Sequence, residues 1–178
     1  NGTLLLDAID VVIDDTVTTN TGTLTINAEN DITSSGGVTG VITSVSGLIS
    51  LTADDDANSD GTIDYDAVIQ GGSGGVTFSL ADTDGDISGV ISGTGPVTKN
   101  GAGTLAFATG TTHTYTGQTT VNTGRLNVNG VTNAGSALVV ESGGTLGGTG
   151  TVNGTVTVNS GGRVAPGTSP QYYPQVGA

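Results

Sequence analysis

The fold is decided by residues 100–166, which read NGAGTLAFATGTTHTYTGQTTVNTGRLNVNGVTNAGSALVVESGGTLGGTGTVNGTVTVNSGGRVAP. Apolar residues there alternate with Thr, Asn or Arg in four short runs, Thr104 to Phe107, Arg125 to Val128, Ala137 to Val140 and Thr155 to Val158. This period of two is typical of half-buried β-strands. Gly and Asn separate the runs and supply the positive φ angles that tight corners need. Because no single run can bury its apolar side alone, the runs must stack on one another, which predicts a β-solenoid.

A glycine-led motif, Gly-x-(Leu/Val)-x-apolar, extends this prediction to the rest of the chain. Its copies begin at Gly2, Gly22, Gly47, Gly75, Gly103 and Gly124, and in weaker form at Gly144 and Gly162. We therefore predict an all-β chain, a right-handed parallel β-helix with coils of about 18–28 residues, the range over which the motif recurs. The alternative, a globular β-sandwich, fits poorly because two Phe, four Tyr and no Trp provide few large core residues.

One solenoid domain is predicted over residues 1–166. Its coils at 1–99 are acidic and carry Asp-rich insertions, whereas those at 100–166 are the regular repeat coils. Residues 167–178, which end in QYYPQVGA, are predicted to form a tail because prolines interrupt the alternation there.

The net charge of −13 argues against nucleic acid and anionic membrane surfaces as partners, since both need basic patches. No apolar run approaches the roughly 18 residues of a membrane-spanning helix, so membrane insertion is not expected. The absence of Cys excludes disulfides and thiolate metal sites.

Residues 1–86 hold 15 of the 16 acidic side chains and no Lys or Arg. Such an uneven charge favours cations, or a polar head-to-tail contact between solenoid ends.

Residues 54–66, DDDANSDGTIDYD, are the strongest candidate for a metal site. From Asp56 onward they follow the first nine positions of an EF-hand calcium loop, with Gly61 at the sharp turn. Ala67 stands where the loop's bidentate Glu is expected, so a neighbouring Asp would have to complete the shell. A solvated acidic turn without a cation is the alternative.

A second acidic group follows the first at the interval that separates Gly47 from Gly75. If coils stack with this interval, Asp82, Asp84 and Asp86 lie over Asp54, Asp56 and Asn58. By the same argument, Glu29 and Asp31 precede Asp54 and Asp56 by the interval from Gly22 to Gly47. Stacked carboxylates repel one another unless a cation bridges them. The predicted calcium ligands are Asp54, Asp56, Asn58, Asp60, Asp64, Asp66, Asp82, Asp84 and Asp86.

Residues 101–170 resemble the autotransporter-associated β-strand repeat of bacterial type V secreted surface proteins. The resemblance rests on the spacing of GAGTLAFATGTTHTYTGQTTVNTGRLNVNG and on the closing segment GGTLGGTGTVNGTVTVNSGGRVAPGTSP. The chain departs from the family pattern at Gln171, where Gly is expected. The resemblance implies a right-handed β-helix exported to the cell surface, and it implies no chemistry because the repeat is a scaffold.

The predicted function is that of a non-catalytic extracellular or cell-surface scaffold for adhesion, matrix or filament formation, stabilised by calcium. The expected partners are the solenoid's own ends and a host or matrix surface. The alternative is a polysaccharide-acting lyase or hydrolase on the same fold. It is disfavoured because Lys99, Arg125 and Arg163 all lie outside the acidic region. His113, the sole histidine, is predicted to be an exposed strand residue without a catalytic partner.

Overall fold

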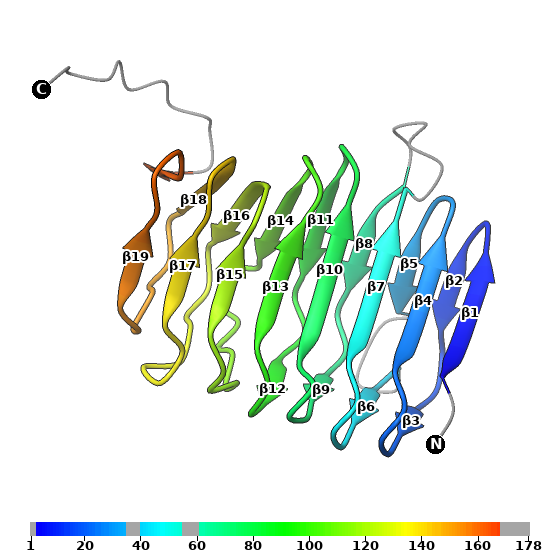
Figure 1. The fold of residues 1–178 in the computed structure, drawn as a ribbon. Helices are drawn as coiled ribbons and strands as arrows, with labels where there is room; N and C mark the ends of the chain where they lie inside the picture. Colours follow the sequence, from blue (N-terminus) through cyan, green and yellow to red (C-terminus); the bar gives the residue numbers. More distant parts are fainter. Residues whose placement is uncertain (1–2, 35–39, 55–60, 168–178) are drawn as a thin grey trace, which may run out of the picture.

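A computed structural model describes residues 3–34, 40–54 and 61–167. The described chain contains 20 β-strands and no helix, and the strands stack in parallel as successive coils (Figure 1). The predicted β-solenoid is therefore confirmed. Nor does the described part of the chain contain a helix that could cross a membrane.

Each of the first four coils contributes one strand to each of three sheets. The first sheet consists of β1 (Leu4–Ala8), β4 (Leu24–Ala28), β7 (Ile49–Ala53), β10 (Val76–Leu80), β13 (Val97–Asn100), β15 (Thr119–Val121), β17 (Leu138–Val140) and β19 (Val156–Val158). The second sheet consists of β2 (Val11–Ile13), β5 (Ile32–Ser34), β8 (Ile63–Tyr65), β11 (Asp84–Ile87), β14 (Thr104–Phe107), β16 (Gly124–Val128), β18 (Gly144–Gly148) and β20 (Arg163–Pro166). The third sheet consists of β3 (Val17–Thr19), β6 (Ile42–Ser44), β9 (Ile69–Gly71) and β12 (Ile91–Gly93).

After β12 the third face continues without strands. Only isolated parallel bridges join Thr112 to Val131 and Val131 to Thr151 there. The coils also differ in length, as the register of the first sheet shows. The longest coil joins the partners Ile49 and Val76, and the shortest joins Leu138 and Val156 near the C-terminal end.

The glycine motif does not mark the same face throughout the chain. Gly75 directly precedes β10 in the first sheet, whereas Gly103 directly precedes β14 in the second sheet. The predicted coil from Gly75 to Gly103 is therefore wrong, because Val76 pairs with Val97 instead. The motif signals a strand start after a corner, and both long sheets have such corners.

The core follows directly from the alternation of side chains along each strand. In β10, Val76, Phe78 and Leu80 point into the solenoid and are buried, while the two residues between them are half-exposed. Stacking places each inward side chain on its counterpart in the next coil, as Leu51 on Phe78. Narrow corners bring backbone into contact with backbone: Gly93 has a φ of 115°, and a Cβ there would lie 1.7 Å from a carbonyl oxygen of the preceding coil. Only glycine fits such a corner.

Candidate functional site

Six of the nine predicted calcium ligands lie in the described residues. Asp54 follows β7, is buried and has a φ of 58°. Asp64 lies on β8 and Asp66 directly after it, both exposed. Asp82 lies exposed between β10 and β11, and Asp84 and Asp86 lie on β11. Asp56, Asn58 and Asp60 lie outside the described residues.

The register differs from the one that the sequence suggested. Asp86 pairs with Asp64, not with Asn58. Asp54 and Gly61 lie in contact, since a Cβ on Gly61 would lie 2.5 Å from the backbone nitrogen of Asp54. The residues between Asp54 and Gly61 lengthen the stretch of chain that leads from β7 to β8. The interval in sequence from β8 to β11 is therefore shorter than the interval from β7 to β10. Asp86 therefore does not lie over Asn58 but over Asp64, another residue of the 54–66 stretch, and the predicted partners Asp56 and Asn58 lie outside the described residues.

Asp64 and Asp86 instead form a pair on the outer face of the second sheet. They are direct neighbours in adjacent parallel strands, and Asp86 is partly buried. Desolvation raises the pKa of Asp86 above its ordinary value, and the negative charge of Asp64 raises it further. Two carboxylates at neighbouring ladder positions destabilise the sheet unless one is protonated or a cation lies between them.

Other aspartates serve as acceptors that join one coil to the next. At the corner before the second sheet, Asp10 accepts a hydrogen bond from the Asp31 backbone N–H at 3.4 Å. Asp31 in turn accepts from the backbone N–H of Thr62 at 2.9 Å and from its hydroxyl at 3.0 Å. Further along the stack, Asp84 accepts from the backbone N–H of Thr104 at 3.2 Å. These hydrogen bonds join neighbouring coils through the aspartate side chains and need no metal for that role.

Asp66 is also part of a contact between coils. Its carboxylate accepts a hydrogen bond from the Ser34 hydroxyl, and its backbone N–H donates to the same hydroxyl oxygen at 2.9 Å. Among the described residues, no group of three or more His, Cys, Asp or Glu side chains is arranged to hold a metal ion. The calcium site thus stays a prediction that depends on the residues of the loop at 55–60.

His113 lies inside the solenoid, which corrects the prediction that it is exposed. Its side chain is 0% exposed, and its ring centroid lies 4.4 Å from that of Phe107. The backbone N–H of Ile91 donates to Nδ1 at 3.1 Å, so the neutral ring carries its proton on Nε2. Burial lowers the pKa of His113 to about 4. The alternation was the missed signal, because His113 shares its phase with the buried Tyr115.

Lys99 is a second interior polar side chain that sequence analysis did not place. It stands in the inward position between Phe78 and Val121 and is 1% exposed. Its Nζ donates to the carbonyl oxygens of Asn100 at 2.6 Å and Gly101 at 3.0 Å. Burial lowers the pKa of Lys99 to about 8, and the negative charge of a nearby aspartate opposes that shift.

Arg125 joins the last three coils on the outside of the second sheet. Its Nε donates to Asn127 Oδ1 at 2.5 Å, and its Nη2 donates to the carbonyl oxygens of Ala165 at 3.0 Å and Gly167 at 2.7 Å. The side chain crosses β18 at Gly147, where a Cβ would lie 2.0 Å from Nη2. This glycine therefore makes room for the arginine.

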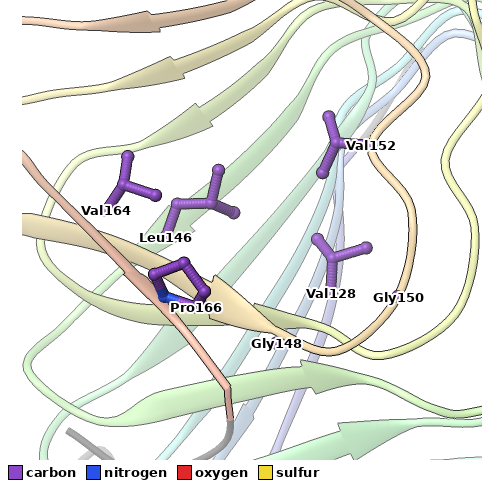
Figure 2. A pocket seen from close by; sticks show the side chains of 8 residues that line it. Val128, Leu146, Gly148, Gly150, Val152, Val164 and Pro166 are labelled. Atoms are coloured by element: carbon purple, nitrogen blue, oxygen red, sulfur yellow. The ribbon is translucent and has the colours of Figure 1, made fainter. Parts of the chain in front are cut away.

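A hollow of about 130 Å³ lies among the same last coils. Figure 2 shows the side chains of Val128, Leu146, Val152 and Val164 around it, with Pro166 alongside. The other lining residues are glycines, so no lining side chain donates or accepts a hydrogen bond. The hollow is apolar and offers no side-chain group for catalysis.

The sequence is similar to that of the adhesin BmaC autotransporter of Brucella suis biovar 1 (strain 1330). The two are 38% identical over 110 residues, which cover 61% of this chain. The resemblance to autotransporter passengers is confirmed. The chain spans 3% of the length of that adhesin, so the comparison concerns a short section of a long protein. No protein-family model matches the chain, and no solved structure matches it.

Proposed function

We propose that this chain is a rigid, non-catalytic segment of a bacterial surface protein that acts in adhesion. The observation that carries the proposal is a parallel β-solenoid whose sequence is 38% identical to an autotransporter adhesin over 110 residues. A solenoid with one continuous core resists bending and can hold a binding surface away from the cell. The adhesin relative also supports a location at the cell surface or outside the cell.

The test is display of the chain on a non-adherent bacterium that carries an autotransporter export system. We expect displaying cells to attach to epithelial cells and to matrix-coated surfaces more than cells that display an unrelated passenger of similar length. Equal attachment of the two strains, with equal surface expression shown by antibody labelling, contradicts the proposal.

We retain calcium as part of this proposal. It is supported by the like-charged pair Asp64 and Asp86 and by the EF-hand-like order of residues 54–66. Calcium is expected to raise the melting temperature and EDTA to lower it. A melting temperature that neither addition changes contradicts calcium stabilisation and leaves the adhesive role intact.

Head-to-tail assembly through the solenoid ends stays a prediction, which electron microscopy of purified chain tests. Long fibres support it, and dispersed short rods contradict it.

The alternative function, a polysaccharide-acting enzyme, predicts release of new reducing ends or unsaturated sugars on incubation with glycans. In our proposal neither product forms.

A further inference from the structure

The outer face of the first sheet carries an ordered array of hydroxyl and amide side chains. One column runs across five successive strands in direct register and consists of Thr25, Ser50, Thr77, Thr98 and Thr120. A second column, two residues further along each strand, contains only Asn, Thr and Ser from Asn27 to Asn122. Figure 1 shows these five strands of the first sheet, β4, β7, β10, β13 and β15, side by side on one face. We call this surface the hydroxyl face.

The hydroxyl face is regular in both directions. Parallel strands repeat at about 4.8 Å, and alternate residues along a strand at about 6.6 Å. All ten positions are half-exposed. β-Branched Thr is stiff at χ1, so the repeated backbone geometry repeats the direction of the hydroxyl group as well. The second column is further ordered by an amide contact, in which Asn122 Nδ2 donates to Asn100 Oδ1 at 2.8 Å.

The first column keeps its hydrogen-bonding capacity for an external ligand. Its five hydroxyl groups make no hydrogen bond to any residue that the structure describes, whereas most of the Ser and Thr hydroxyl groups that do form hydrogen bonds join neighbouring coils. The buried Thr119, on the inward side of β15, bonds to Tyr115 and Ser136. Its outward neighbour Thr120 is half-exposed and faces water.

The charge distribution selects the kind of ligand. Although the chain carries a net charge of −13, the hydroxyl face contains no charged side chain from β4 to β15. Charged residues of these columns stand only beyond it, at Asp7 on β1 and at Glu141 after β17. An anionic polymer would be repelled by the chain as a whole, and a cationic one would bind the acidic second sheet instead. A neutral ligand fits the neutral face.

We propose that the hydroxyl face binds a neutral polysaccharide chain that lies across the strands. The ligand's hydroxyl groups recur with each sugar ring. The length of one ring along the polymer is similar to the strand spacing of about 4.8 Å. Each coil then offers the next sugar two polar side chains in the same arrangement, a hydroxyl from the first column and a hydroxyl or an amide from the second. Single contacts are weak, but contacts linked along one polymer add up to a useful affinity. The inference rests on the proposed adhesive function and supplies its ligand class.

The test compares two double variants of the full chain. In Thr77→Val/Thr98→Val, two central hydroxyl groups are lost while the β-branched shape is kept. In the control, Thr33→Val/Thr145→Val, two half-exposed threonines on the outer face of the second sheet change in the same way. Binding to dextran, galactomannan and hydroxyethyl cellulose is measured by affinity electrophoresis, with alginate as an anionic polymer. Circular dichroism melting confirms that both variants fold.

We expect the unaltered chain and the control variant to bind at least one of the neutral polymers. Neither the unaltered chain nor either variant should bind alginate. The Thr77/Thr98 variant should bind about tenfold more weakly or worse, because two hydrogen bonds are lost. The proposal is overturned if the two variants bind equally, if no neutral polymer binds, or if the face arrests ice growth while binding no glycan. Attachment of displaying cells that persists in the Thr77/Thr98 variant overturns this inference alone. The proposed function is overturned if cells that display the unaltered chain attach no better than cells that display the unrelated passenger.

Discussion

The coils of β1–β12 and those of β13–β20 share the two long sheets but fill their interiors differently. In the first group, the described interior consists mainly of stacked Ile, Leu and Val, with Phe78 and Tyr65. In the second group, Lys99, His113 and Thr119 occupy inward positions among the apolar residues. The charged surface differs in the opposite sense, because the described acidic side chains of the first group lie on its outside, with the exception of the buried Asp54.

This contrast shows that a regular repeat motif and an apolar core are separate properties. The second group carries the recognisable repeat, and its coils shorten toward the C-terminal end. Most of its interior polar groups find partners in the stack, as in the chain of hydrogen bonds from Tyr115 to Thr119 to Ser136 to the Gly117 carbonyl, whereas His113 Nε2 makes no hydrogen bond to the described residues. Satisfied polar groups cost little when buried, so a short coil tolerates them.

The largest expected effect comes from the apolar interior of the first group. Phe78→Ala removes a ring that is 0% exposed between Leu51 and Lys99. We expect the free energy of unfolding to fall by about 3–5 kcal/mol, measured by urea denaturation. Thr77→Ala on the outer side of the same strand should change it by less than about 0.5 kcal/mol. Similar losses for both variants would show that the interior of this group is not the main source of stability.

The next prediction concerns Lys99 and the pH dependence of the second group. The pKa of Lys99 falls from 10.5 to about 8 on burial. Between these values the unfolded chain binds the extra proton, so stability is gained as pH rises and is lost as pH falls through about 8. Relative to Lys99→Met, the unaltered chain should gain about 3 kcal/mol between pH 7 and pH 10.5.

Urea denaturation of both proteins at several pH values measures this difference. The raised pKa values of Tyr65 and Tyr115 are common to both proteins and cancel in the comparison. A difference in unfolding free energy that does not vary with pH would mean that Lys99 reaches water.

Gly147 tests whether Arg125 holds the last coils together. In Gly147→Ala the new Cβ displaces the guanidinium from the carbonyl oxygens of Ala165 and Gly167. Loss of these charge-assisted hydrogen bonds should cost about 2 kcal/mol and speed amide hydrogen exchange in β20. Gly135→Ala is the matched control, because its Cβ would approach nothing closer than 3.5 Å.

The effect of Gly147→Ala should be much smaller in an Arg125→Ala background, where the contact of the new Cβ with Asn127 Oδ1 remains. If the two substitutions add, the arginine is not what the glycine accommodates.

The smallest effect is expected at the carboxylate pair of the first group. Asp86→Asn removes the repulsion with Asp64 and should stabilise the chain at pH 7 by less than about 1 kcal/mol. Because the pKa of Asp86 is raised, this gain should shrink as pH falls and the carboxyl group becomes protonated. The measurement is the melting temperature of both proteins at pH 4 and pH 7. Unchanged differences at the two pH values would contradict the pair.

Alternation of side chains was enough to predict the strands, the stacking and most of the core. The same rule places His113 and Lys99 inside, although their polarity argued for the surface. Register was beyond the sequence wherever an insertion occurs, because the glycine motif marks corners of different sheets. The pairing of Asp64 with Asp86 depends on that register. The reach of Arg125 joins residues in three coils, which no local pattern encodes.

The hydrogen bonds that join one coil to the next point along the axis of the solenoid, as from the Leu24 N–H to the Leu48 carbonyl. A force that pulls on the two ends of such a rod acts in line with these bonds and loads them one row at a time. The rod then yields by releasing single coils, each of which adds about 60–90 Å of extended chain. When the ends are pulled apart suddenly, we expect the molecule to lengthen in steps. The force at its far end then rises more slowly, and a contact made there survives longer.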